Sequence, residues 1–317
     1  MIKFSVIIIS YNHASFLEER IVSILNQTYP HYEIIFFDDA STDNSQSVIE
    51  RYRHHSKVTH LLLNKVNSGF QSRNWQQAIE LAKYDWIWIA EGDDVAEPEF
   101  LEKAAASLSH NKEVLLYSNA YKLETGKGRT GSKLYSRIKD SFFQTQHWLT
   151  NYFEEGKTEL DRFHKYVCII NNVSSAIFPR QPALEVLAQF PHKRFHNDWL
   201  FFALLMEKFP VQYLSEPLTG YRYHPGSHFS VSGNELEKRI ECFEILQYFF
   251  KQNYISNKND LARFYTEQYL GFGLWKHISW IPTLGSAFFK QNPRLAILFF
   301  YYLFLLKLSR KKVKYIF

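Results

Sequence analysis

The first 120 residues alternate between short apolar runs and stretches in which apolar positions recur every three or four residues. Continuous apolar runs rich in β-branched residues are typical of strands that are buried on both faces of a sheet. Strands are therefore predicted at residues 4–10, 32–37, 58–63, 84–90 and 114–117.

The segments between these runs have the spacing of amphipathic helices. In residues 72–83, Trp75, Ala78, Ile79 and Ala82 fall on one helical face. Strand and helix in alternation predict an α/β fold with a mostly parallel, Rossmann-like sheet flanked by helices. Ligands of such sheets bind beyond the carboxyl ends of the strands, so the residues that follow each strand are candidates for a site.

The pattern changes twice further along the chain. Residues 120–170 are irregular, with several glycines and basic residues, which predicts a mobile loop. After residue 234 the chain is helical in pattern and rich in aromatic residues, so we expect one domain over residues 1–232 and a helical C-terminal region over 233–317. Between the loop and this boundary we expect an extended segment, a helix and a short strand at residues 171–178, 199–209 and 211–214.

Charge balance, the two cysteines and the N-terminal residues each limit the class of protein. The 317 residues carry 37 basic and 32 acidic side chains, a balance that gives no nucleic-acid-binding signature. Cys168 and Cys242 lie far apart without metal-binding spacing, which favours free thiols in a reducing compartment. The N-terminus enters the first apolar run directly, so we interpret it as a strand and not as a signal peptide.

Acidic residues follow two of the predicted strands. Asp38 and Asp39 end the second strand, where one carboxylate is expected to cap the next helix while the other faces the cleft. Glu91, Asp93 and Asp94 form a second acidic turn, with Gly92 allowing a tight bend. Three carboxylates within four residues favour a divalent cation such as Mg²⁺ or Mn²⁺. A solvated acidic turn ahead of a helix is the alternative, and the turn alone leaves both open.

Longer stretches carry a resemblance. The first stretches are Phe4-Ser-Val-Ile-Ile-Ile-Ser-Tyr-Asn12, Ser23-Ile-Leu-Asn-Gln-Thr-Tyr29 and Glu33-Ile-Ile-Phe-Phe-Asp-Asp-Ala-Ser-Thr-Asp43. They are followed by Asn67-Ser-Gly-Phe70, Arg73-Asn74 and the acidic turn. Together these stretches resemble family 2 glycosyltransferases. The resemblance covers about residues 3–230. It implies the GT-A fold, a nucleotide-sugar donor for which the family-level expectation is a UDP-linked sugar, and sugar transfer with inversion.

The resemblance also implies a role for each matching residue. Tyr11 would lie against the donor base and Asp39 would hydrogen-bond that base. Arg73 would lie near the donor phosphates, Asp93 would contact the donor sugar or ribose, and Asp94 would hold Mn²⁺ or Mg²⁺ on the diphosphate. The family often has Asp at the first position of the turn, where this chain has Glu91, so a carboxylate remains with altered ligand geometry.

The predicted catalytic base lies further along. An inverting transferase needs a base to take the proton of the acceptor hydroxyl, and Asp198 matches the family's Asp at this point, although Asn197 replaces the usual Glu. The alternative for Asp198 is a helix N-cap. Arg222 and His224 match the family's Tyr-Arg-x-His segment, and either a contact with the diphosphate or a salt bridge fits them.

The C-terminal tail combines an uncharged apolar run, residues 295–306, with basic residues at 310, 311, 312 and 314. The run is too short to span a bilayer. It resembles a helix that lies on an anionic membrane surface, and we therefore expect peripheral membrane contact through residues 293–317, on the cytoplasmic side. The alternative is a terminal helix packed on Phe249, Phe250, Tyr269 and Trp275.

The expected function is transfer of a hexose or N-acetylhexosamine from a nucleotide-diphosphate sugar to a glycan or lipid-linked acceptor, in polysaccharide or other glycan assembly. A sugar nucleotidyltransferase is the enzyme alternative, but residues 10–14 lack the glycine and basic residues of its phosphate loop. An inactive sugar- or lipid-binding scaffold is the other alternative, and the presence of all four acids at positions 39, 93, 94 and 198 argues against it.

Overall fold

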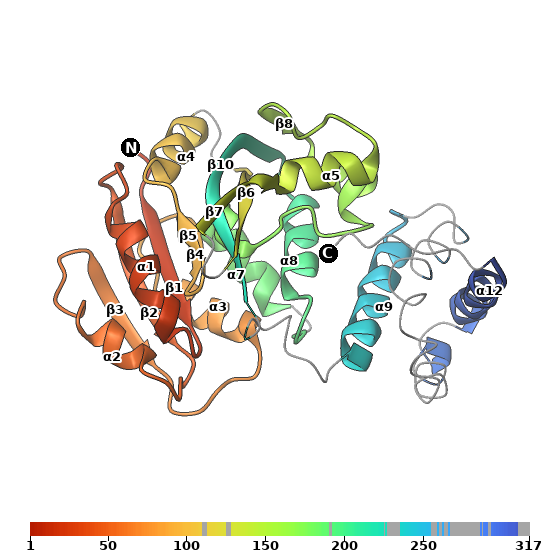
Figure 1. Cartoon of the computed structure of the whole chain (residues 1–317), viewed down its shortest axis with the longest axis horizontal. Helices are drawn as coiled ribbons and strands as arrows, with labels where there is room; N and C mark the ends of the chain where they lie inside the picture. Colours follow the sequence, from red (N-terminus) through yellow and green to blue (C-terminus); the bar gives the residue numbers. More distant parts are fainter. Residues whose placement is uncertain are drawn as a thin grey trace.

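A computed structural model describes residues 1–109, 113–124, 128–189, 192–224, 226, 235–254, 259, 262, 266, 286, 288–290 and 293–309. Its centre is one sheet in the strand order β3-β2-β1-β4-β9-β6-β10-β5, with β7 paired to β6 and β8 to β10 (Figure 1). The strands are β1 Phe4–Ser10, β2 Tyr32–Asp38, β3 Val58–Leu63, β4 Trp86–Glu91, β5 Val95–Ala96, β6 Leu115–Glu124, β7 Gly128–Leu134, β8 Tyr152–Glu154, β9 Ala176–Pro179 and β10 Val211–Tyr223.

The sheet is mixed, and the strands from the N-terminal part of the chain are parallel to one another. Strands β3, β2, β1 and β4 are parallel neighbours, and β6 and β10 are also parallel. Strand β9 runs antiparallel between β4 and β6. The predicted α/β class and GT-A architecture are therefore confirmed, and β1 and β3 have the predicted bounds.

Helices cover both faces of the sheet, as the fully apolar strands require. Along β1, Val6 and Ile8 join a core cluster with α1, α2 and α4, whereas Ile7 and Ile9 join a second cluster with α3, α7 and α8. These helices are α1 Ala14–Leu25, α2 Ser45–Glu50, α3 Gln71–Glu80, α4 Phe100–Leu108, α7 Arg180–Ala188 and α8 Asn197–Met206.

Residues 120–170 differ from the sequence-based prediction. The expected mobile loop is wrong for the described residues, which form the rest of β6, then β7, α5 Tyr135–Phe143, β8, α6 Gly156–Glu159 and a π-helical turn Leu160–His164. Buried polar pairs organise this segment: the Tyr117 hydroxyl accepts from the Trp148 indole N–H at 2.7 Å, and Tyr152 donates to Glu159 at 2.8 Å. A periodicity search misses such an element because it is held by scattered polar and aromatic contacts.

Strand β10 is also longer than predicted. Its residues 211–214 pair with β6 as expected, but the strand continues to Tyr223 through register shifts around Pro217. This extension carries Arg222 to the sheet edge where β4 ends, because Gly220 pairs with Val95 of β5.

Two described helices follow residue 232: α9 Glu235–Lys251 and α12 Pro293–Ser309. Helix α9 lies beside α8, with the Trp199 and Phe249 rings 6.0 Å apart, and α12 lies beyond it (Figure 1). Phe299 of α12 packs on Phe243 of α9 at 5.1 Å. The division into domains at residue 232 stays a prediction, and Tyr269 and Trp275, two of the predicted packing partners of the tail, lie outside the described residues.

Helix α12 has two different faces. Ala296 and Phe299 are buried, whereas Ile297, Tyr301 and Phe304 are more than half exposed. Within the described part of the chain, no helix is both long enough and apolar enough to cross a bilayer.

Candidate active site

Parallel pairing brings the predicted site residues to one edge of the sheet. Ser10 pairs with Asp38, and Ile9 pairs with Glu91, so β1, β2 and β4 end side by side. Tyr11, Asp39 and the acidic turn at residues 91–94 therefore leave the sheet at the same edge, which is where ligands of parallel sheets bind.

Asp39 is buried and saturated with donors. Its carboxylate accepts hydrogen bonds from the Asn64 amide at 2.9 Å, the Ser68 N–H at 3.0 Å, the Ser68 hydroxyl at 2.9 Å and the Asn74 amide at 2.9 Å. A carboxylate offers about four lone-pair sites, so these donors fill it. Asp39 therefore fixes the loop between β3 and α3, and its predicted contact with a donor base stays a prediction.

The expectation that Asp38 or Asp39 caps the next helix is wrong. Asp38 accepts from the Ser41 N–H at 2.9 Å and from the Gln46 side chain at 2.8 Å, which closes the turn before α2. The backbone N–H of Ser45, the first residue of α2, instead donates to Asp43 at 2.9 Å. A second Asp43 oxygen accepts from the Ala14 N–H at 3.0 Å, which ties this turn to the start of α1.

Two predicted donor-binding residues are exposed at this edge. Tyr11, just beyond β1, has 45% of its surface accessible. Arg73 lies in the first turn of α3, where its guanidinium stacks over the Phe70 ring at 4.7 Å. Both side chains are therefore accessible to a ligand, and no described contact assigns either to a particular group of that ligand.

Asp93 faces two histidines. Its carboxylate lies 3.1 Å from His224 Nε2 and 3.8 Å from His13 Nε2. One ligand atom from each of these three residues falls within 4.8 Å of the others. Burial alone would raise the pKa of Asp93, but the charges of His13 and His224 and the hydrogen bond from His224 lower it, so the carboxylate stays ionised.

Gly92 makes this arrangement possible. A Cβ at this position would lie 2.8 Å from His13 Nδ1, a distance that real Cβ atoms do not adopt, and 3.0 Å from the Ile9 carbonyl oxygen, which is unusually tight. His13 Nδ1 is buried and has no hydrogen-bond partner among the described residues. The imidazole is thus held by packing against the turn, with its Nε2 directed to Asp93.

Asp94 points inward from the same turn. It is 1% exposed, and its two oxygens accept from the Arg222 N–H at 3.0 Å and from the Asn172 amide at 2.8 Å. Burial and the neighbouring charge of Asp93 raise its pKa to about 6. The assignment of Asp94 to a metal stays a prediction.

Arg20 of α1 is the buried cation beneath the turn. It is fully buried, stacks over the Trp88 ring at 5.0 Å, and within the described ranges none of its guanidinium nitrogens has a hydrogen-bond partner. Burial lowers its pKa to about 10 against the opposing charges of Asp94, Asp93 and Glu91. Burial, together with the charges of Asp93 and Asp94, raises the pKa of Glu91 to about 8. The charge of Arg20 therefore does not keep the pKa values of Glu91 and Asp94 in their ordinary range.

Arg222 joins two elements around this turn. Its guanidinium donates to the Asp93 backbone carbonyl at 2.7 Å and forms an ion pair with Glu19 of α1 at 2.5 Å. The salt-bridge alternative therefore describes the contacts of Arg222. A contact of Arg222 or His224 with a diphosphate stays a prediction.

Asp198 lies in the first turn of α8, one residue after the helix begins. The N-cap position belongs to His196, so the alternative role of Asp198 as an N-cap is wrong. Its carboxylate accepts from the Trp199 N–H at 2.8 Å. Burial raises its pKa, opposed by the charge of His196 and that N–H. Beside it, Asn197 accepts from the Lys193 N–H at 3.0 Å through its side-chain oxygen.

The hydroxyl of Tyr221 is affected by the charges of three of these carboxylates. Burial raises the pKa of its hydroxyl far above the ordinary value, and the charges of Tyr135, Asp94, Asp93 and Asp198 raise it further. The charges of all three carboxylates thus reach one hydroxyl. That Asp198 faces the same pocket as the acidic turn stays a prediction.

Comparison with known proteins identifies the family. The model of "Glycosyl transferase family 2" matches residues 5–170, about half of the chain. The chain belongs to glycosyl transferase family 2. The resemblance found in the sequence is thereby confirmed, and the other half of this family 2 chain, from residue 171, lies outside the match.

Curated relatives of this family 2 chain match over about a third of its length. One is the poly(ribitol-phosphate) beta-N-acetylglucosaminyltransferase TarS of Staphylococcus aureus, which is 33% identical over 37% of this chain. Two are from Bacillus subtilis: the putative teichuronic acid biosynthesis glycosyltransferase TuaG is 34% identical over 31% of this chain, and the putative glycosyltransferase EpsE is 37% identical over 35%. The matched segments span 21%, 39% and 40% of those proteins, so the chain covers well under half of their length.

The fold comparison extends further than the sequence comparison. A crystal structure of S. aureus TarS 1–349 in complex with UDP-GlcNAc covers 97% of this chain and 89% of the TarS fragment, with a TM-score of 0.66 and 18% identity. At this identity the likeness establishes the fold. It includes the region after residue 170, which the family model does not match.

Sequence reasoning missed three residues of this family 2 site. His13 has no metal-binding spacing in the sequence, yet it meets Asp93 and His224, which lie 80 or more residues further along the chain. Arg20 lies on the apolar face of α1, and a charged residue on an otherwise apolar helix face is the signal that could have found it. Tyr221 occurs within the Tyr-Arg-x-His segment, but its place beside the acidic turn follows from the extension of β10, where the N–H of the next residue, Arg222, donates to Asp94.

Proposed function

We propose that this chain is an inverting glycosyltransferase that moves a sugar from a UDP-linked donor to an acceptor hydroxyl during assembly of a surface polysaccharide. The observation that carries the proposal is the group of His13, Asp93 and His224, with Asp94 beside it, at the sheet edge of a family 2 fold. Relatives named for teichoic and teichuronic acid synthesis support the polysaccharide context.

The donor is proposed to lie along the ends of β1, β2 and β4. Tyr11 is exposed at that edge, where it can cover a base, while the loop that Asp39 fixes forms one wall. Arg73 is exposed in the first turn of α3, and both its charge and the helix N-terminus favour a phosphate there. The complex of TarS with UDP-GlcNAc supports uridine as the base.

A divalent cation fits the group His13, Asp93 and His224. Two imidazoles and a carboxylate are a donor set that Mn²⁺ accepts, and the otherwise unpartnered Nδ1 of His13 shows an imidazole held by packing rather than by a protein hydrogen bond. When bound, such an ion would neutralise charge on the departing diphosphate. We propose that these three residues contact the cation, and that Asp94 fixes the turn that presents Asp93.

Asp198 is proposed as the general base. Its carboxylate accepts the proton of the acceptor hydroxyl while that oxygen bonds to the anomeric carbon and the bond from this carbon to the diphosphate breaks on the opposite side. The configuration at the anomeric carbon is inverted as a result. A buried carboxylate with a raised pKa is a stronger base than an exposed one, which supports this role.

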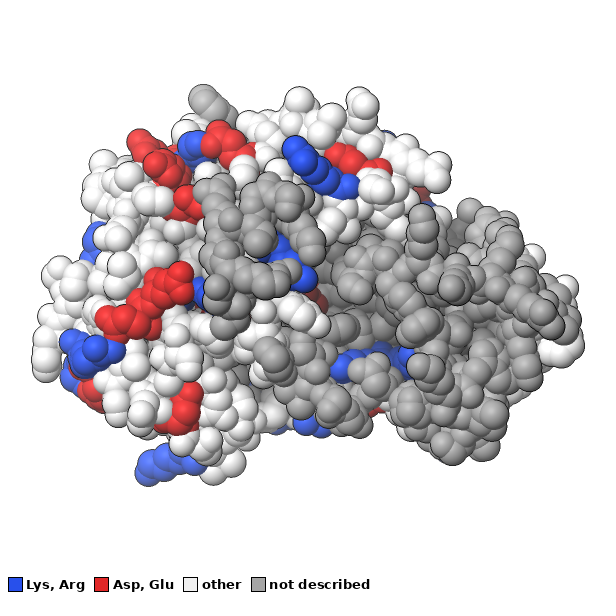
Figure 2. Space-filling view, viewed as in Figure 1, with Lys and Arg blue, Asp and Glu red and all other residues white. Residues whose placement is uncertain are grey.

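Helix α12 is proposed to lie on an anionic membrane surface, where lipid-linked acceptors are found. Ile297 and Phe304 are exposed and seven residues apart, so they share one face of the helix. The sequence continues into four basic residues at 310, 311, 312 and 314, which complement anionic lipid headgroups. On the face shown in Figure 2, the described acidic and basic side chains lie in small mixed groups rather than in one basic field.

A thermal-shift screen of nucleotide sugars, with and without Mn²⁺, tests the proposed function. A specific ligand of the folded state raises the melting temperature. We expect UDP-sugars with Mn²⁺ to do so and to yield a β-linked product from an α-linked donor, as judged by NMR of the product. A nucleotidyltransferase would instead release pyrophosphate from a nucleoside triphosphate, and a scaffold would bind sugar without turnover.

A further inference from the structure

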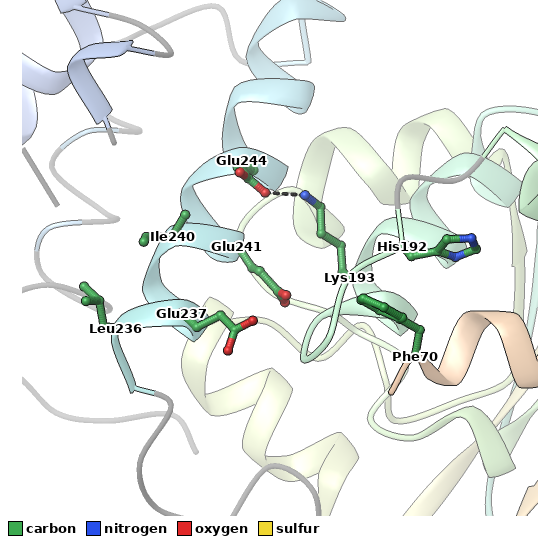
Figure 3. A pocket seen from close by; sticks show the side chains of 8 residues that line it. All are labelled: Phe70, His192, Lys193, Leu236, Glu237, Ile240, Glu241 and Glu244. Carbon is green, nitrogen blue, oxygen red and sulfur yellow. Dashed lines mark hydrogen bonds and ion pairs between the residues drawn. The ribbon is translucent and has the colours of Figure 1, made fainter. Parts of the chain in front are cut away.

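A cavity lies between α9 and the segment that leads into α8. It has a volume of about 530 Å³ and is lined by residues that include Phe70, His192, Lys193, Glu237, Glu241 and Glu244 (Figure 3). Cavities of about 300–1,000 Å³ hold small organic ligands in proteins. None of the residues that line it belongs to the donor and base groups described above.

Helix α9 presents three glutamates to this cavity, spaced four and three residues apart so that they share a face. Glu241 is held rigidly, because its carboxylate accepts from the Arg194 N–H at 2.7 Å and the Phe195 N–H at 2.9 Å. Glu244 pairs with Lys193, and Glu237 lies 3.4 Å from Arg194. The lining thus carries three carboxylates and one ammonium group.

The opposite wall is aromatic. The Phe70 and His192 rings lie 5.9 Å apart, and the His192 Nδ1 is 3.0 Å from the Ser72 hydroxyl at the start of α3. Burial and the charge of Arg73 lower the pKa of His192, so its ring is neutral. Apolar ring faces opposite hydrogen-bond acceptors match the two sides of a sugar, whose C–H groups stack while its hydroxyls donate.

The cavity adjoins both parts of the proposed site. Phe70, which lines the cavity, also stacks with Arg73, whose guanidinium lies 4.7 Å from the ring centre. At the α8 end, Glu241 lies 3.5 Å from His196, two residues before Asp198. A molecule in this cavity therefore lies between the wall of the proposed donor site and the helix turn that carries the proposed base.

We propose that this cavity binds the acceptor and selects an uncharged sugar unit over a polyol phosphate. The inference rests on the proposed transfer reaction and names its second substrate class. Carboxylates accept hydrogen bonds from hydroxyls. Among the described residues, Lys193 and Arg194 are already paired with Glu244 and Glu237, so the cavity offers a phosphate no uncommitted cation. The acceptor would thus differ in charge from the poly(ribitol-phosphate) in the name of TarS.

Glu237 provides the test, because it is exposed and its only described ion pair is a long surface pair, so that replacing it leaves the fold intact. Binding is measured by ligand-observed NMR with a panel of methyl glycosides of glucose, galactose, N-acetylglucosamine and rhamnose, and with ribitol 5-phosphate. Glu185→Gln is the matched control, since Glu185 forms a comparable exposed pair with Lys208 at 3.3 Å, away from the cavity.

We expect at least one methyl glycoside to bind at millimolar concentration and ribitol 5-phosphate not to bind. Glu237→Lys should weaken the glycoside about tenfold, by removing a charged hydrogen-bond acceptor, and should allow ribitol 5-phosphate to bind. Glu185→Gln should change neither. Equal binding of both probes, binding of none of them, or a Glu237→Lys variant that matches the control would overturn the inference.

Donor binding separates this inference from the proposed function. UDP-GlcNAc with Mn²⁺ is titrated into the same three proteins. Unchanged donor affinity in all of them, combined with acceptor binding that ignores Glu237, overturns only the acceptor site. Loss of donor binding in the unmodified chain contradicts the proposed function instead.

Discussion

Acidic residues follow both neighbours of β1 in this sheet, β2 and β4, and the surroundings of the two acidic groups differ. After β2, the Asp39 carboxylate receives hydrogen bonds from Asn64, Ser68 and Asn74. After β4, Glu91, Asp93 and Asp94 lie together near the buried Arg20, and the pKa values of Glu91 and Asp94 are raised to about 8 and about 6. The same residue type at the same edge therefore has two different electrostatic environments.

The difference separates a structural role from a chemical one. A buried carboxylate with all its lone pairs filled stabilises the loops that donate to it. A group of carboxylates that lacks compensating charge is unfavourable by itself and gains from a cation or a proton, which is characteristic of functional sites. Asp198 belongs to the second kind, since it accepts one described hydrogen bond and has a raised pKa.

The largest expected effect comes from Asp198→Asn, which removes the proposed base and should lower kcat by about a thousandfold while donor affinity stays the same. The unmodified chain should lose activity as the pH falls through the pKa of Asp198, because only the carboxylate accepts a proton, and burial places this loss above the ordinary value for aspartate, about 3.9. A pH–kcat profile measures both. An Asp198→Asn variant with near-normal turnover would exclude the role.

Asp93→Asn should lower transfer by about a hundredfold or more, through loss of the proposed cation contact. The free energy of unfolding should change by less than about 1 kcal/mol, because the lost contacts with His13 and His224 are offset by reduced repulsion with its acidic neighbours. Steady-state kinetics and urea unfolding measure the two quantities. A large loss of stability with retained activity would show that Asp93 has a structural role and would contradict the difference drawn between the two strand ends.

Asp39→Asn should have the opposite profile. Its new amide group would face the donors of Asn64, Ser68 and Asn74, so the free energy of unfolding should fall by about 2–3 kcal/mol. Urea unfolding followed by circular dichroism measures the loss. If the variant is as stable as the unmodified chain but no longer binds donor, Asp39 acts on the donor directly and not through the loop.

Asp94→Asn distinguishes the two assignments of the cation. Asn172 can turn its amide so that its unpartnered oxygen accepts from the new Asn, which preserves the turn. If Asp93 and the histidines hold the ion, Mn²⁺ affinity should fall by about tenfold, as for a residue that supports a ligand. Electron paramagnetic resonance titration of Mn²⁺ measures it. A loss greater than that of Asp93→Asn would favour Asp94 as the direct ligand.

The smallest effect is expected outside the sheet. Replacing Ile297 and Phe304 by serine should reduce binding to vesicles with anionic lipids severalfold, with no change in donor affinity, because both side chains are on the exposed face of α12. Replacement of the buried Ala296 by serine is the control for the helix itself. Unmodified chain that does not sediment with such vesicles would contradict the membrane proposal.

The sequence predicted the sheet well where local pattern determines structure. The runs that became β1 and β3 are continuous and apolar, and the strand ends correctly located Asp39 and the acidic turn. It failed where structure depends on distant partners. Residues 120–170 form ordered elements around buried polar contacts, and His13 reaches Asp93 only because Gly92 lets α1 approach the turn. No local spacing reports such contacts.

The central claim is that the acidic turn after β4 holds a cation for a nucleotide-sugar donor. Isothermal titration calorimetry of UDP-GlcNAc against the unmodified chain and Asp93→Asn, each with and without Mn²⁺, tests it most directly. The account predicts that Mn²⁺ tightens donor binding in the unmodified chain and that Asp93→Asn removes this gain. Donor binding that is independent of Mn²⁺ in both proteins, or absent from both, would contradict it.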